Sequence, residues 1–155
     1  TKRGPATRLA DALIELVGAK DLEDLIRGYT MYDYQVGADA APLVFRVAEE
    51  GDAVARELIH WAGCELGEMV NAVIRQLDFK DLAFDVVMTG SMFEGGQMLI
   101  EPMRDTVQAL APKARLVRLK VPPVLGAVML GMEAGGNQVT RDIRDRMNET
   151  VLAVR

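Results

Sequence analysis

The feature that most constrains this chain is a single long stripe of apolar side chains at helical spacing. Its members are Val54, Leu58, Trp61, Met69, Val73 and Leu77, and Leu66, Val70 and Ile74 broaden it. A helix of about 26 residues at ~1.5 Å per residue spans roughly 39 Å. Because so long a stripe must be covered by a sheet or by other helices, we expect it to face the core and to pack on a strand at residues 84–88.

Two short segments after this helix are typical of buried strands. Residues 84–88 form a short apolar run with β-branched side chains, and residues 116–119 are predicted to form a second short strand. A helix from about Gly96 to Leu110 separates them, and Pro102 predicts either a start at Glu101 or a kink. A strand, a helix and a second strand with short connections predict a right-handed parallel βαβ unit.

The other segments are predicted to be mostly helical. The first helix is expected over 8–17, with Thr7 as its N-cap and Gly18 as its stop. Further helices are expected from Asp21 to Ile26, from Pro42 to Glu49, over 123–134, and from Asn137 or Thr140 to Val154. Residues 29–40 are expected to form an ordered loop. Two parallel strands cannot cover this many apolar helix faces. The chain is therefore predicted to be part of a larger α/β domain, or to borrow strands from a partner.

Composition excludes several classes of protein. The chain has 155 residues, of which 50% are hydrophobic and 26% charged, as in an ordinary globular domain. Its longest apolar run, 121–132, is interrupted by prolines and glycines, so no membrane span is expected. The sequence has one cysteine, Cys64, and no visible secretory leader. These features favour a reducing, cytoplasmic location.

The charge is unevenly distributed. The net charge is −5, with −9 in residues 1–111 and +4 in residues 112–155. A globally acidic chain is a poor nucleic-acid binder, because binding to phosphates needs clustered Lys and Arg. The basic last third either complements the acidic part or faces an anionic ligand.

The side chains that most often carry chemistry are few and scattered. His60 is expected on the surface of the long helix, Cys64 is expected to be a packed thiol, and Glu65 and Glu68 are expected at a solvated edge. No His or Cys cluster has metal-ligand spacing. The sequence predicts neither a metal site nor a catalytic residue within this chain.

One turn carries the strongest signal for a ligand. The strand at 84–88 runs directly into Thr89, Gly90 and Ser91, followed by Phe93. Parallel sheets present ligands beyond the carboxyl ends of their strands, and Gly90 lets the backbone approach a ligand closely. The alternative is a structural turn in which Gly90 only adopts a positive φ.

Four stretches, taken in order, resemble the C-terminal part of a known family. These are Arg3–Thr7, the segment from Gly51–Asp52 through Ala62–Gly63 to Leu66–Gly67, Val86–Phe93, and Val121–Gly131. They are similar to the family of N-acetylglucosamine kinases and BadF/BadG/BcrA/BcrD-type ATPases. That family belongs to the superfamily of actin, hexokinase and heat-shock chaperones.

The resemblance implies a mostly helical α/β fold with about two parallel strands, the C-terminal part of the second domain of a ribonuclease H-like ATPase. It implies transfer of the γ-phosphoryl group of ATP, with Mg²⁺, to a hydroxyl of an amino sugar. The adenosine would lie on Thr89, Gly90 and Ser91, with Phe93 nearby. The first phosphate loop and the catalytic aspartate would lie in an N-terminal domain that has no counterpart here, and the second phosphate loop would precede Thr1.

The implied partners are the nucleotide, the amino sugar and the missing N-terminal domain, with a homodimer left open and neither nucleic acid nor membrane expected. The alternative function is a BadF-type ATPase, or a regulatory ATP-binding protein like the activators of dehydratases. Such activators hold an iron–sulfur cluster between subunits through cysteines, and the single Cys64 does not resemble that arrangement. A purely helical interaction module is the third possibility.

Overall fold

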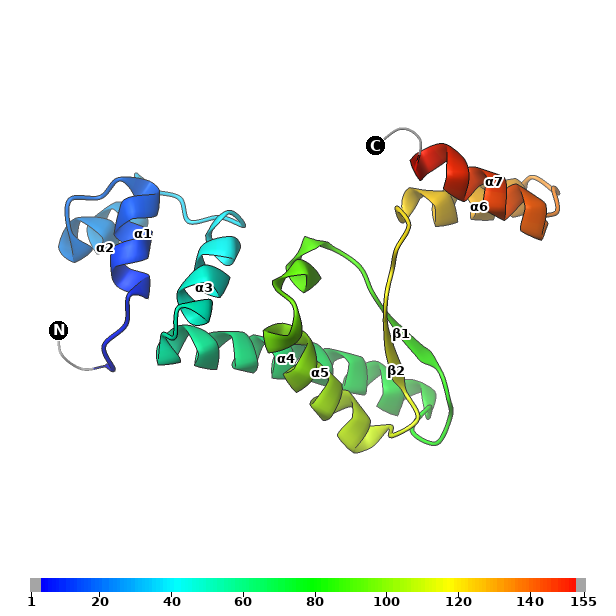
Figure 1. The fold of residues 1–155 in the computed structure, drawn as a ribbon, viewed down its shortest axis with the longest axis horizontal. Coiled ribbons are helices and arrows are strands. Elements are labelled where there is room, and N and C mark those ends of the chain that lie inside the picture. The colour runs from blue at the N-terminus through cyan, green and yellow to red at the C-terminus, as the bar shows by residue number, and fades with distance from the viewer. Residues whose placement is uncertain (1–3, 153–155) are drawn as a thin grey trace. The chain divides into compact units, whose positions relative to one another are not determined.

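Seven α-helices, one short 3₁₀-helix and two strands make up residues 4–152, the part of the chain that the computed structural model describes (Figure 1). In order they are α1 (Leu9–Val17), α2 (Leu22–Thr30), α3 (Ala40–Glu49), α4 (Ala53–Leu77), β1 (Asp85–Met88), η1 (Ser91–Gly95), α5 (Gln97–Leu110), β2 (Arg115–Arg118), α6 (Val124–Ala134) and α7 (Arg141–Leu152). The prediction of a mostly helical chain with two parallel strands is confirmed.

The chain divides into two units, which we describe separately. The larger unit contains the residues up to Phe84 together with Gly90–Ala114, and the smaller unit contains Asp85–Thr89 with the residues from Arg115 onward. The larger unit therefore holds α1 to α5 and η1. The smaller unit holds both strands, α6 and α7.

Helix starts follow side-chain capping. The Asp21 carboxylate accepts the N–H of Asp24 at 2.9 Å and begins α2 as predicted. The Thr7 hydroxyl accepts the N–H of Leu9 at 3.1 Å, although Arg8 occupies the N-cap position of α1. Gly18, with φ +70°, ends α1. The helix α2 continues to Thr30, beyond the predicted end at Ile26.

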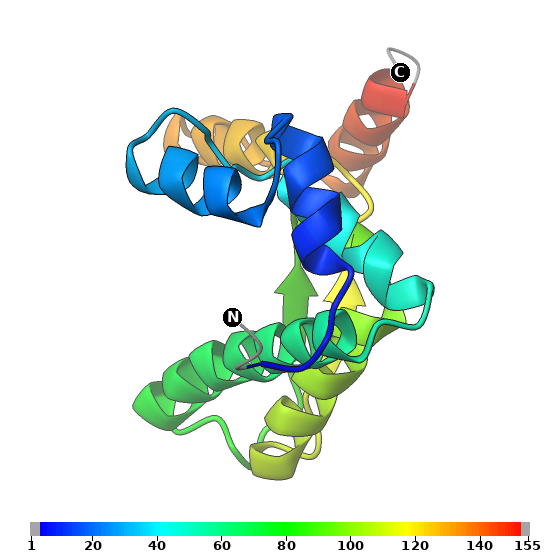
Figure 2. The same cartoon turned by 90° about the vertical axis from the view of Figure 1, so that its left-hand side faces the viewer.

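The main packing contact of the larger unit joins α4 to α5, which lie side by side in Figure 2. Gly63 and Gly67 make this approach possible. A Cβ atom on Gly63 would lie 2.5 Å from the Leu99 carbonyl oxygen and 2.6 Å from Cγ of Pro102. The helix α5 starts at Gln97 rather than at Glu101, so Pro102 lies inside it. At the two glycines, α5 therefore packs directly on the backbone of α4.

The predicted core face of α4 is wrong. The buried residues of this helix are Ala55, Ile59, Gly63, Gly67, Asn71 and Ile74. Trp61 and Met69 of the predicted stripe are instead 58% and 67% exposed, and Val73 is 52% exposed. The face of α4 that contacts α5 consists of small residues, because only they allow the two helices to approach this closely. The largest side chains of α4 lie outside this contact.

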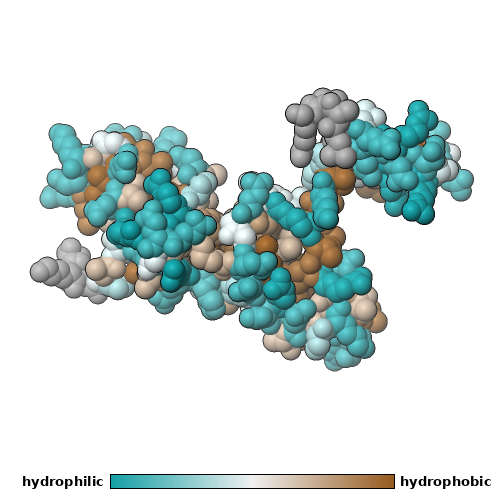
Figure 3. Space-filling model, viewed as in Figure 1, coloured by the Kyte–Doolittle hydropathy of each residue, from teal (hydrophilic) through white to brown (hydrophobic). Residues whose placement is uncertain are grey.

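The core of the larger unit lies where α3, the first half of α4 and α5 meet. Its fully buried members are Val47, Ala48, Ala55, Ile59 and Leu99. Apolar atoms also reach the surface of this unit over α1 and α2 (Figure 3). No residue of α1 is buried, so that helix is only partly covered.

The smaller unit contains a two-stranded parallel sheet. The strands β1 and β2 pair in register from Asp85 with Arg115 to Met88 with Arg118, which confirms the predicted parallel pairing. The helix α6 is apolar on all sides and packs against α7, while Leu130 of α6 is 68% exposed. The predicted end of the last helix at Val154 and the first residue of the Arg3–Thr7 motif lie outside the described residues.

Candidate functional site

The turn after β1 is held in a conformation that requires glycine. Gly90 has φ 106° and ψ 155°, and Gly96 has φ 74° and ψ −151°. Both combinations belong to a region of backbone space that side chains with a Cβ essentially never occupy. The two glycines frame the short helix η1.

Ser91 lines a cavity of about 350 Å³ within the larger unit. We call it the Ser91 cavity. The wall opposite η1 is one face of α3, with Pro42, Phe45, Arg46 and Glu49 at helical spacing. Ala38, Ala41, Met92, Glu94 and Gly95 complete the lining. A Cβ atom on Gly95 would overlap the Phe45 ring, so this glycine lets η1 pack directly on α3.

The predicted site residues have different surroundings. Ser91 lies in the cavity lining, whereas Phe93 is half-buried and packs against the core around Leu99. Thr89 directly follows β1 and belongs to the smaller unit. The structure therefore places Ser91 in a cavity and Phe93 against the hydrophobic core of the larger unit.

The residues of α3 that line the cavity were missed by the sequence reasoning. Pro42, Phe45, Arg46 and Glu49 share a helix face, and that spacing is visible in the sequence. Nothing in the sequence, however, connects that face to a turn more than 40 positions later. Contact between α3 and η1 is a property of the folded larger unit.

The charges of the Ser91 cavity are mixed. Arg46 and Glu49 are exposed, and neither side chain has a hydrogen bond or an ion pair with the rest of the described chain. Glu94 adds a second carboxylate to the lining. The lining thus contains one guanidinium and two carboxylates.

The described residues contain no group of three or more His, Cys, Asp or Glu side chains that could hold a metal ion. His60 and Cys64 lie one turn apart on α4, with 3.8 Å between Nδ1 and Sγ, and Cys64 is half-buried. Across the same residues, no helix is both long and apolar enough to cross a membrane.

Comparison with known proteins relates the chain to a sugar kinase. It is 28% identical over 137 residues to an N-acetyl-D-glucosamine kinase of Dictyostelium discoideum. The match covers 84% of this chain but 42% of that kinase, so the chain spans less than half the length of this relative. No protein-family profile matches the chain, and no solved structure matches it. The chain is thus a distant relative of this kinase.

Proposed function

We propose that this chain is the nucleotide-side part of an ATP-dependent sugar kinase similar to N-acetylglucosamine kinase, and that the Ser91 cavity receives the nucleoside of ATP. The observation that carries the proposal is the position of Ser91. Ser91, the last residue of the turn that the sequence predicts as the nucleotide site, lines a cavity together with α3. The distant relationship to a kinase supports the same reading.

The size and lining of the cavity fit a nucleoside. A volume of about 350 Å³ lies within the range of small-molecule sites, which are mainly apolar with a few polar groups. Pro42 and Phe45 supply the apolar surface. Arg46 can donate to the ring nitrogens of a purine, and Glu49 can accept from its exocyclic amino group. The Ser91 hydroxyl can accept from or donate to a ribose hydroxyl.

The charges of the cavity favour the uncharged end of ATP over its phosphates. Glu49 lies in the lining beside Arg46, and its carboxylate offsets the guanidinium charge. Because this pair offers no excess positive charge to a triphosphate, the phosphates would extend away from the cavity. No group of three or more His, Cys, Asp or Glu side chains among the described residues could hold Mg²⁺ by itself, and the ion would enter with the triphosphate.

Catalytic residues are assigned to the part of the longer protein that this chain does not contain. Phosphoryl transfer depends on positioning and on preorganised charge. A chain without phosphate loops or a general base is expected to lack sugar phosphorylation. Phosphorylation of N-acetylglucosamine or other hexoses by the purified 155-residue chain would contradict this assignment.

The test of the nucleotide site is a substitution that fills the cavity. Ala41 is an exposed lining residue in the first turn of α3. Ala41→Trp in the full-length protein is expected to weaken ATP binding at least tenfold, about 1.4 kcal/mol, when measured by calorimetry. The matched control is Ala53→Trp, because Ala53 is also exposed in the first turn of a helix but lies outside the cavity. Unchanged ATP affinity in folded Ala41→Trp would refute the site.

The sugar that accepts the phosphoryl group is tested in a separate experiment. We expect the full-length protein to transfer phosphate from ATP to N-acetylglucosamine in preference to unmodified hexoses. ATP hydrolysis with no sugar product from any hexose would instead favour the ATPase alternative. Cys64 is the only cysteine of the chain, so nothing here favours an iron–sulfur activator.

A further inference from the structure

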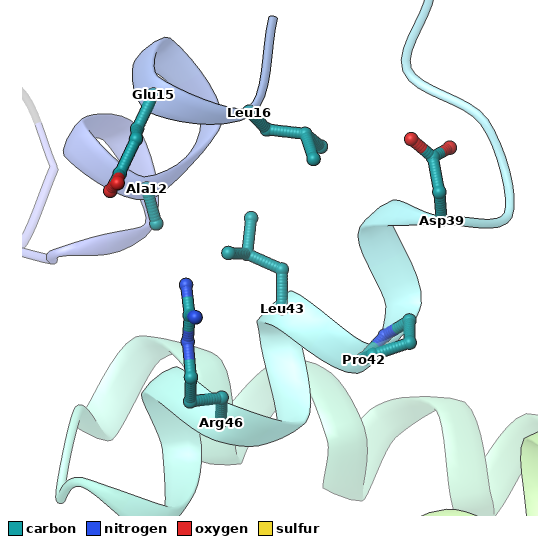
Figure 4. A pocket seen from close by; sticks show the side chains of 7 residues that line it. All are labelled: Ala12, Glu15, Leu16, Asp39, Pro42, Leu43 and Arg46. Atoms are coloured by element: carbon teal, nitrogen blue, oxygen red, sulfur yellow. The ribbon is translucent and has the colours of Figure 1, made fainter.

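A second cavity lies between α1 and α3 and is not used by the proposed function (Figure 4). Its volume is about 380 Å³, again within the range of small-molecule sites. Leu16 and Leu43 form its apolar floor, and Glu15, Asp39 and Arg46 stand around them. We call it the α1–α3 cavity. All of its residues belong to the larger unit.

The three charged side chains are available to a ligand. Glu15, Asp39 and Arg46 are exposed, and within residues 4–152 none of their side chains makes a hydrogen bond or an ion pair. Figure 4 shows Glu15 and Arg46 on one side of the two leucines and Asp39 on the other. Glu15 and Arg46 point into the same space without pairing with each other. The cavity therefore has a mixed-charge end, an apolar middle and an acidic end.

We propose that the α1–α3 cavity binds a basic α-amino acid of the lysine type. An α-amino acid carries an ammonium and a carboxylate on one carbon, so its head group can bridge Glu15 and Arg46, which do not reach each other. A chain of methylene groups can then lie over Leu16 and Leu43, and the side-chain ammonium can pair with Asp39. Each charge of the ligand meets an opposite charge, and its apolar stem meets an apolar surface.

Other ligand classes fit this pattern less completely. A simple anion would pair with Arg46 but would face the carboxylates of Glu15 and Asp39. A diamine would leave Arg46 without a partner, and an amino acid with an apolar side chain would leave Asp39 unused. Specificity is a difference between affinities, and the basic amino acid alone satisfies all three groups.

The test compares L-lysine with three analogues that each lack one group. Norleucine lacks the side-chain ammonium, cadaverine lacks the carboxylate, and 6-aminohexanoate lacks the α-ammonium. Binding to the purified chain is measured by calorimetry and by ¹H–¹⁵N NMR. Lysine is expected to bind several-fold more tightly than each analogue, because exposed charge pairs contribute modestly. The shifts are expected to centre on Leu16 and Leu43.

Three variants assign each group of the ligand to its partner. Asp39→Asn is expected to bring lysine and norleucine to equal affinity. Arg46→Gln is expected to do the same for lysine and cadaverine, and Glu15→Gln for lysine and 6-aminohexanoate. Arg144→Gln, an exposed change on α7 in the smaller unit, is the control and is expected to keep all preferences. Circular dichroism verifies that each variant is folded.

Two results would overturn the proposal. One is the absence of lysine binding to the unmodified chain up to about 10 mM, which corresponds to a binding free energy of only about −3 kcal/mol. The other is a lysine preference that persists in Asp39→Asn. The Glu15 and Asp39 variants separate this proposal from the nucleotide site, because Glu15 and Asp39 line the α1–α3 cavity and not the Ser91 cavity, whereas Arg46 lines both.

Discussion

The carboxylate of Asp52 joins Thr7 to the start of α4. Its Oδ1 atom accepts the Thr7 hydroxyl at 3.0 Å and the Ala55 N–H at 2.9 Å, while Oδ2 accepts the N–H of Arg8 at 2.8 Å. The N–H groups of Arg8 and Ala55 hold the pKa of this carboxyl below its usual value. One side chain thus caps α4 and fixes the segment that leads into α1.

Replacing Asp52 is therefore expected to destabilise the larger unit more than replacing an N-cap residue that makes no contact beyond its own helix. Asp52→Ala removes the cap and both contacts with the N-terminal segment, and the melting temperature is expected to fall by several degrees. Asp52→Asn keeps most of the geometry and should lose less. Glu57→Ala, an exposed change on the same helix, is the control. Equal melting temperatures for Asp52→Ala and Glu57→Ala would contradict this role.

Lowering the pH is expected to reduce the free energy of unfolding, in part through protonation of Asp24. Its pKa is lowered from 3.8 to about 2, first by the hydrogen bond from the Lys20 N–H and then by those from Arg27 and Tyr34. Because the folded-state pKa lies below the unfolded value, the contribution of Asp24 is complete above about pH 4. It is lost progressively as the pH falls through about 2.

The measurement is chemical unfolding from pH 6 downward for the unmodified chain and for Asp24→Asn. The stability difference between the two is expected to be constant above about pH 4 and to shrink below it. Tyr34→Phe removes one of the three hydrogen bonds and should give an intermediate result. A stability difference that does not change with pH would show that Asp24 does not contribute in this way.

Gly63 is expected to tolerate no side chain. A Cβ atom at this position would lie 2.5 Å from the Leu99 carbonyl oxygen, so Gly63→Ala should force α4 and α5 apart. Overpacking of this kind costs about 1–3 kcal/mol. The control is Gly126→Ala in α6, where a Cβ would meet nothing within 4 Å and where alanine should stabilise the helix by about 0.5–1 kcal/mol. Denaturant unfolding should give opposite signs for the two changes.

Introducing a charge at two adjacent positions of α4, Val73 and Ile74, is expected to affect the melting transition differently. Ile74 is 2% exposed and Val73 is 52% exposed. Ile74→Asp buries a carboxylate without a partner, which costs several kcal/mol, and should abolish cooperative melting. Val73→Asp places the charge at a half-exposed site and should retain a cooperative transition. Loss of that transition in Val73→Asp would mean that the outer face of α4 is buried in solution.

Local features of the fold could be predicted from the sequence. Asp21 caps α2 where expected, because an N-cap involves residues only a few positions apart. The two strands and their parallel pairing also followed from the change in apolar period. The candidate turn was located through Gly90, whose φ of 106° requires a residue without a Cβ.

Tertiary contacts alone decided which face of α4 is buried and which residues share a cavity. Hydrophobicity ranks Trp61 and Met69 above Gly63 and Gly67 as core residues, yet α5 packs on the glycines because only they allow its backbone to approach. The Ser91 cavity similarly depends on η1 meeting α3. A sequence pattern reports the order of side chains along one segment, whereas burial depends on the distance to a second segment, which is fixed only when both have packed.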